Sequence, residues 1–137
     1  MQIVLDTCAL LSFLTGESMR KTTVQAIENA QTRATVWVPS IAAMEIAQKV
    51  TVGRLRLPDG SSPRAWFTRA LNQPGFEEWP ITAEIAIAAY ELPEPFHKDP
   101  TDRAIVATAR LLDAPVVTVD RQILAYGRLG HVQTIPY

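Results

Sequence analysis

Short apolar runs alternate along this chain with stretches in which apolar residues recur every three or four positions. The apolar runs contain many Val and Ile residues with little polar alternation, and they predict strands at 2–6, 35–40, 76–82, 115–120 and 132–136. The periodic stretches predict helices at 19–31, 41–50, 62–71, 82–92 and 100–112. Residues 53–63 are rich in Gly, Pro and Ser, which is typical of an irregular loop.

The order of these elements predicts the fold class. Strands that alternate with helices are typical of an α/β fold, and strands that are apolar on both faces are typical of a parallel sheet covered by helices. We therefore expect a three-layer sandwich, in which helices flank a central, mostly parallel sheet of four or five strands. A length of 137 residues fits a single domain that spans 1–137.

Composition narrows the class of protein. The longest apolar runs are too short to cross a bilayer, and the opening MQIVLD lacks the basic segment of a signal peptide. The single cysteine, Cys8, excludes an internal disulfide and a cysteine-based zinc site. We therefore expect a cytoplasmic protein with no membrane contact.

The net charge of −1 gives no overall attraction for nucleic acid. A polyanion would need a local basic surface or a metal ion. Four arginines in the middle of the chain could supply that surface, or they could form a solvated face: Arg54, Arg56, Arg64 and Arg69.

The stretch HKDPTDRAIVATA opens the predicted helix at 100–112 and places an acid in line with the apolar side of that helix. Ile105 and the apolar residues after it follow Asp102 at spacings of three and four. Local helix chemistry alone explains the acids, because Asp99 is a good N-cap, Pro100 suits the first helical position and the first turn favours anions. The alternative is that Asp102 faces a site, and the rest of the chain decides between the two.

Three further acids point to the same edge of the predicted sheet. Asp6 and Asp120 each end a predicted strand, and Glu45 lies one turn inside the helix that follows the second strand. Each has an ordinary alternative, since a strand-terminal Asp can cap the next helix and Glu45 can pair with Lys49. Function in open parallel sheets gathers beyond the carboxyl ends of the strands, where these acids would meet Asp102.

Converging carboxylates would repel one another and raise each other's pKa, unless a divalent cation neutralises them. With only two histidines and no cysteine pair, the ligands would be oxygens, which select Mg²⁺ or Mn²⁺. Such a site suits phosphodiester hydrolysis. Thr118 shares a strand face with Asp120 and could position a water or an acid, or simply be a β-branched strand residue.

Four blocks of the chain resemble PIN-domain ribonucleases, specifically the VapC-type toxins of toxin–antitoxin pairs, over nearly the full length. The blocks are VLDTCALL (4–11), PSIAAMEIAQKVTVGRLRLP (39–58), HKDPTDRAIVATA (97–109) and VVTVDRQILAYG (116–127). The resemblance implies catalytic roles for Asp6, Glu45, Asp102, Thr118 and Asp120. It implies metal binding by Asp6, Glu45, Asp99, Asp102 and Asp120.

The resemblance also implies a function and partners. These are Mg²⁺- or Mn²⁺-dependent endoribonuclease activity on an RNA substrate, inhibition by a cognate antitoxin whose peptide lies across the active-site groove, and a homodimer. We interpret His97 as structural or substrate-facing rather than metal-binding, and Arg103 as an ion-pair partner rather than a phosphate contact. The helix at 62–71 and the adjoining loop are our choice for the antitoxin contact.

The main alternative is a PIN-like domain that binds or scaffolds without catalysis. Two other α/β enzymes that carry an Asp after a strand fail on particular residues. A phosphatase of the haloacid dehalogenase type needs a second Asp where Cys8 stands. A response-regulator receiver needs a pair of acids before the phosphoacceptor, but QIVL precedes Asp6. The identity of the RNA remains open.

Overall fold

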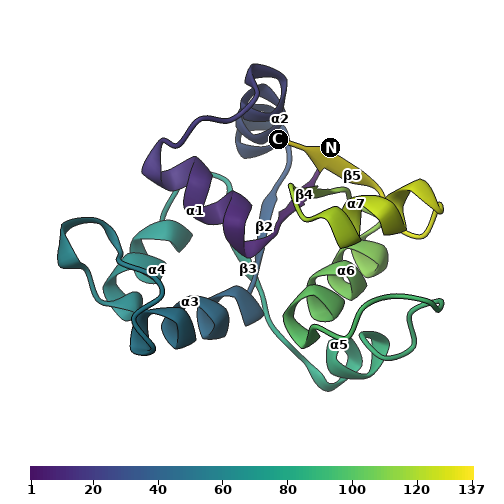
Figure 1. The fold of residues 1–137 in the computed structure, drawn as a ribbon. Coiled ribbons are helices and arrows are strands. Elements are labelled where there is room, and N and C mark those ends of the chain that lie inside the picture. Colours follow the sequence, from purple (N-terminus) through teal and green to yellow (C-terminus); the bar gives the residue numbers. More distant parts are fainter.

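The computed structural model describes residues 1–137 and contains one five-stranded sheet in the order β3-β2-β1-β4-β5 (Figure 1). The strands are β1 (Ile3–Leu5), β2 (Val36–Pro39), β3 (Phe76–Trp79), β4 (Val116–Thr118) and β5 (Thr134–Pro136). Every neighbouring pair of strands is parallel. The predicted α/β fold with a central parallel sheet is therefore confirmed.

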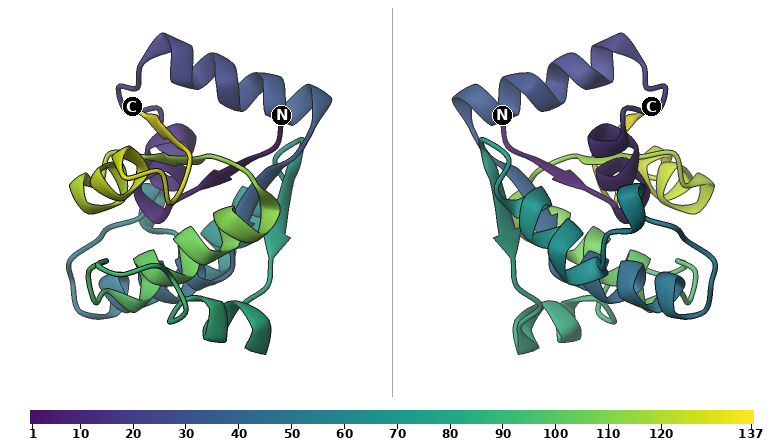
Figure 2. Two further views of the ribbon diagram at one scale, coloured as in Figure 1. Left: turned by 90° about the vertical axis from the view of Figure 1, so that its right-hand side faces the viewer. Right: turned by 90° about the vertical axis from the view of Figure 1, so that its left-hand side faces the viewer.

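Seven α-helices surround the sheet. They are α1 (Thr7–Thr15), α2 (Lys21–Arg33), α3 (Ile41–Thr51), α4 (Pro63–Leu71), α5 (Ala83–Ala88), α6 (Pro100–Leu112) and α7 (Arg121–Arg128). Helices α2 and α5 lie at opposite ends of the molecule in all three views (Figures 1 and 2). None of the helices is both long enough and apolar enough to cross a membrane.

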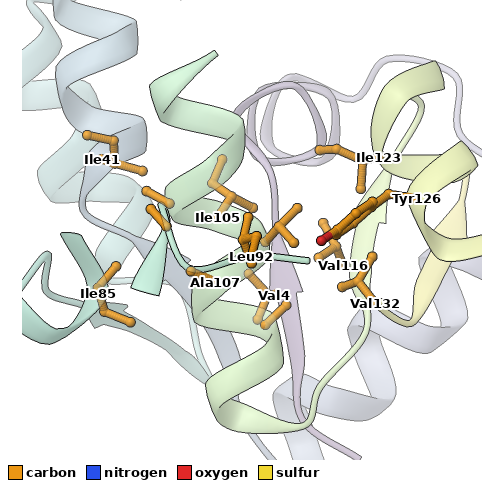
Figure 3. Close-up of a cluster of buried hydrophobic side chains, with 14 of the residues drawn as sticks. Val4, Ile41, Ile85, Leu92, Ile105, Ala107, Val116, Ile123, Tyr126 and Val132 are labelled. Carbon is orange, nitrogen blue, oxygen red and sulfur yellow. The ribbon is translucent and has the colours of Figure 1, made fainter. Parts of the chain in front are cut away.

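The strands divide the core into two layers because successive side chains of a strand point to opposite faces. Ile3 and Leu5 of β1 join one cluster, which contains residues of α1, α2, α3 and α4. Val4, between them, joins the other cluster, which contains residues of α5, α6 and α7. Figure 3 shows this second cluster, with Ile41 and Ile85 at one end and Tyr126 at the other.

Two helices escape the sequence prediction, and one is shorter than predicted. Helix α1 (TCALLSFLT) follows an apolar strand directly and is itself largely apolar. Helix α7 has only eight residues, so the helical spacing of its buried Ile123 and Tyr126 covers a single turn. Helix α5 ends at Ala88 rather than at residue 92. The carbonyl of Ala89 accepts a hydrogen bond from Arg103 Nε at 2.8 Å, and Pro93 follows shortly after. Local apolar spacing could not reveal that tertiary contact.

Candidate functional site

The site lies at the point where the strand order reverses. Strand β1 is flanked by β2 on one side and by β4 on the other, so the carboxyl ends of β1 and β4 open into a crevice between diverging connections. A cavity of about 250 Å³ occupies this edge. All five predicted metal-binding acids line it: Asp6, Glu45, Asp99, Asp102 and Asp120.

Asp6 follows β1 directly and is 5% exposed. One of its oxygens accepts a hydrogen bond from the backbone N–H of Ala9 at 2.7 Å, which caps α1, and the other accepts one from the Thr118 hydroxyl. Burial raises the pKa of Asp6 to about 6, and the charges of Asp120 and Glu45 contribute to the rise. The two hydrogen bonds lower the pKa but do not cancel the effect of burial.

Thr118 is fully buried at the end of β4 and joins two of the acids. Its hydroxyl donates to Asp6 and accepts a hydrogen bond from the backbone N–H of Asp120 at 2.9 Å. Asp120 in turn caps α7, because its Oδ1 accepts from the N–H groups of Gln122 and Ile123 at 2.9 and 3.0 Å. Thr118 therefore positions acids, which is one of the two roles that the sequence left open.

Asp102 lies in the first turn of α6 with its side chain 19% exposed. Its Oδ2 is 3.0 Å from Nε2 of His97, although the two atoms lack the alignment of a hydrogen bond. Burial raises the pKa of Asp102 to about 7, and the charges of Asp99, Asp120 and Glu45 raise it further. This carboxylate accepts no hydrogen bond from the protein, so no hydrogen bond offsets the effect of burial on its pKa.

Glu45 and Asp99 complete the acidic wall. The Glu45 carboxylate lies 3.6 Å from Nζ of Lys49 one turn along α3, so the predicted pairing exists and the side chain still lines the cavity. Asp99 is the N-cap of α6, and its Oδ1 accepts from the N–H of Asp102 at 2.9 Å. Three helices, α1, α6 and α7, thus begin at acids of this cavity, and their positive N-terminal ends face it.

One close group of possible ligand atoms includes His97, which we interpreted from the sequence as structural or substrate-facing rather than metal-binding. The group consists of three possible ligand atoms that lie within 4.8 Å of one another, one each from His97, Asp102 and Asp120. Asp6 lines the same cavity but lies outside this group. Only the position of His97 two residues before Asp99, in HKDPTD, could have indicated this role, and that signal is weak.

Arg103 has the predicted kind of role with an unexpected partner. It is 4% exposed, and its Nη2 lies 3.0 Å from a Glu94 oxygen rather than near Asp102. Its remaining hydrogen bonds go to the carbonyls of Ala89, Phe96 and His97 at 2.8 to 3.1 Å. This guanidinium fixes the segment that carries His97 onto α6, beside Asp102.

As a whole, the site concentrates like charge where water is partly excluded. Two of its carboxyl groups have a pKa near neutrality because burial and neighbouring acids disfavour their charged forms. Neutralisation by a bound cation would remove that cost. The hydroxyl of Thr7, which lines the cavity, is buried and has no hydrogen-bond partner in the protein, so it is a further free oxygen at this position.

Comparisons with known proteins agree on the fold. The family model described as PIN domain matches residues 3–129. No curated protein matches the chain significantly. Among solved structures, a chain of VapBC2 from Rickettsia felis, bound to a DNA fragment from the promoter, is similar with a TM-score of 0.70 and 15% identity, over 99% of this chain and 98% of that one.

Two other solved structures show the same likeness. A chain of FitAcB from Neisseria gonorrhoeae has a TM-score of 0.63 and 20% identity, over 98% of this chain and 96% of that one. A chain of a toxin–antitoxin complex from Klebsiella pneumoniae has a TM-score of 0.58 and 18% identity, over 88% and 89%. At these identities the likeness is one of fold.

Proposed function

This chain belongs to the PIN domain family, and on that premise we propose that it is a divalent-metal-dependent endoribonuclease, the toxin of a toxin–antitoxin pair. One observation carries the proposal. Five acids from four separate parts of the chain meet around one cavity at the switch point of the sheet, and two of them have a pKa raised toward neutrality. A protein that only scaffolds others gains nothing from this costly arrangement.

The residues at the site fit a hard divalent cation. Asp6, Asp102 and Asp120 would hold it, with Glu45 and Asp99 around them, and carboxylate oxygens favour Mg²⁺ or Mn²⁺. The imidazole of His97 beside Asp102 adds a nitrogen that Mn²⁺ tolerates better than Mg²⁺ does. When bound, such a cation supplies Lewis-acid polarisation of a phosphate and of water.

The chain's own residues prepare the site for a phosphodiester. Thr118 fixes Asp6 and Asp120 relative to each other, so we assign it a positioning role. Arg103 holds the backbone of His97 against α6. The N-terminal ends of α1, α6 and α7 direct their dipoles at the cavity and favour an anionic group there.

The proposed assignment as a toxin is supported by the complexes in which structurally similar chains are found. The solved structures with this fold include a VapBC2 complex and a toxin–antitoxin complex. A cognate antitoxin is therefore the partner that we propose, together with a homodimer in the cytoplasm, as the family resemblance implies. We also propose that residues 1–137 form a single domain, because strand β1 contributes to both core clusters.

A direct test uses the purified protein, free of any partner, and total cellular RNA. We expect new RNA ends with Mg²⁺ or Mn²⁺ and none with a chelator, and sequencing those ends would identify the substrate. Asp6→Asn should abolish both cleavage and the growth arrest caused by the toxin alone, while Glu28→Gln, an exposed acid on α2, should change neither. Full metal-independent activity, or no cleavage of any RNA, would overturn the proposal.

A further inference from the structure

The acid-lined cavity shares wall residues with two further cavities. A cavity of about 410 Å³ shares Glu45, Lys49 and Asp99 with it. Another, of about 350 Å³, shares Cys8 with it and lies between α1 and the segment that follows α3. Because both cavities share wall residues with the acidic one, we treat the three together as one surface and call it the groove.

Two arginines line the outer parts of the groove. Arg54 lines the cavity that adjoins Glu45, and Arg56 lines the cavity that adjoins Cys8. Both side chains are exposed, and neither forms an ion pair with a carboxylate of the protein. The buried Arg103, in contrast, is fully used by Glu94 and three carbonyls. Free guanidinium groups beside an acidic centre are suited to phosphates, which they bind with two parallel hydrogen bonds.

The cavity beside Cys8 has the chemistry of a base-binding pocket. Leu11, Leu55, Leu57 and Pro58 give it apolar walls, while Ser12 and Glu17 add polar atoms to its lining. A nucleobase has the same division, with apolar faces and a polar edge. The volume, about 350 Å³, lies in the range of small-ligand pockets.

We propose, resting on the proposed function, that the groove holds single-stranded RNA, with phosphates on either side of the cleaved bond at Arg54 and Arg56 and one base in the cavity beside Cys8. Two observations favour this occupant. Arg54 and Arg56 attract phosphates on either side of the acids, and the cavity beside Cys8 has room for a base. The central acids would attract a cationic peptide as well, so an RNA strand needs a bound cation there. The net charge of −1 leaves this local surface as the source of attraction.

Cys8 provides a readout that does not depend on cleavage. It is the only cysteine, it is exposed, and it lies on the wall shared by two of the cavities. The probe is a hydrolysis-resistant phosphorothioate single strand of about ten nucleotides, a typical length for a single-strand site. With Mg²⁺ in every sample, a strand at about ten times its Kd should slow maleimide labelling of Cys8 about tenfold by mass action.

Substitutions assign the individual contacts. Arg54→Gln and Arg56→Gln should each weaken strand binding and reduce the slope of log K against log salt by about 0.7, the value expected for one lost phosphate contact. Arg128→Gln, an exposed arginine at the end of α7, is the matched control and should leave the slope unchanged. In a series of strands that each lack one base at a different position, we expect only one position to matter. Loss of the base there should weaken binding by about fivefold to a hundredfold.

The outcomes separate this inference from the function on which it rests. If RNA is cleaved and bound but Cys8 stays fully reactive and the salt slopes do not change, the groove assignment is overturned and the nuclease assignment stands. If a basic peptide protects Cys8 and RNA does not, the groove is a protein-binding site and the inference is equally overturned. If metal-dependent cleavage is absent, the proposed function itself fails.

Discussion

The two ends of α6 border two cavities that differ in size and in charge. The larger, about 620 Å³, lies where β4 and β5 begin, and both of its charged side chains have hydrogen-bond partners: Arg110 donates to the carbonyl of His131, and Asp113 accepts from Gln133 at 3.2 Å. The smaller, about 250 Å³, lies where β1 and β4 end and is lined by five acids and one lysine. We therefore base the proposed functional site on uncompensated like charge rather than on cavity volume.

The largest expected difference between the two cavities comes from removing one acid at each end of α6. Asp102→Asn takes away a carboxylate of the acidic cavity and should reduce metal-dependent RNA cleavage about a thousandfold, because several kcal/mol of charge stabilisation depend on the bound cation. Asp113→Asn at the other end should leave cleavage unchanged, since Asn tolerates the left-handed backbone of that position. Initial rates of cleavage of one RNA substrate measure both. Equal losses in the two variants would refute the assignment.

Helix α6 carries one buried arginine, Arg103, and one exposed arginine, Arg110, and their contributions to stability sharpen the comparison of its two ends. Arg103→Met leaves three carbonyls without a donor and should cost about 3 kcal/mol in the free energy of unfolding. Arg110→Met, which removes an exposed arginine with one carbonyl contact, should cost less than about 1 kcal/mol. Chemical denaturation with matched m-values gives both numbers. A small cost for Arg103→Met would contradict its role as the anchor of the His97 segment.

Stability should depend on pH through the acidic cavity. The pKa values of Asp6 and Asp102 are raised to about 6 and about 7, so the folded protein binds protons more tightly than the unfolded chain does between about pH 4 and 7. The contribution to stability from these two groups is therefore complete below about pH 4 and is lost as the pH rises through 7.

It follows that removing either charge should stabilise the cation-free protein at pH 7.5. We expect Asp6→Asn and Asp102→Asn to raise its free energy of unfolding by about 1–3 kcal/mol, with little effect at pH 4. Asp113→Asn should have no such pH-dependent effect. Urea unfolding at the two pH values in the presence of a chelator checks this, and a loss of stability in both variants at pH 7.5 would contradict it.

The smallest expected effect tests positioning rather than charge. Thr118→Val removes the hydroxyl that links Asp6 to Asp120 and should cost about 1 kcal/mol of stability and about tenfold in cleavage rate. Thr108→Val is the control, because Thr108 is equally buried but donates only to a carbonyl of its own helix. Its cleavage rate should be that of the parent protein. Equal cleavage rates in the two variants would reduce Thr118 to a structural role.

The centre of the sheet could be predicted from the sequence because β1, β2 and β4 are largely buried on both faces and are apolar runs, whereas the edge strands β3 and β5 are partly exposed and have weaker patterns. The convergence of the acids could be predicted as well, since parallel strands that end in Asp must bring those residues to one edge. The sequence left capping and site formation as alternatives for Asp6 and Asp120, and the structure combines them. In each residue a carboxylate caps the next helix and also lines the cavity.

The features that the sequence did not predict depend on tertiary contacts between residues whose spacing along the chain follows no helical or strand period. Arg103 reaches back nine residues to Glu94 through an irregular segment, and no helical or strand period relates the two. The position of His97 against Asp102 follows from that anchor, so it was equally hidden. A short helix such as α7 depends on its cap, Asp120, and on the burial of Ile123 and Tyr126, because their helical spacing alone covers only one turn.

The central physical claim is that carboxylates crowded at this edge are tolerable because they hold a dication. Calorimetric titration of Mn²⁺ into the partner-free protein at about pH 6.5, in two buffers of different ionisation enthalpy, tests it most directly. We predict binding with release of protons, because Asp6 and Asp102 are partly protonated there, and a loss of affinity of about tenfold or more in Asp102→Asn but not in Asp113→Asn. No Mn²⁺ binding, or binding that Asp102→Asn leaves intact, would contradict the claim.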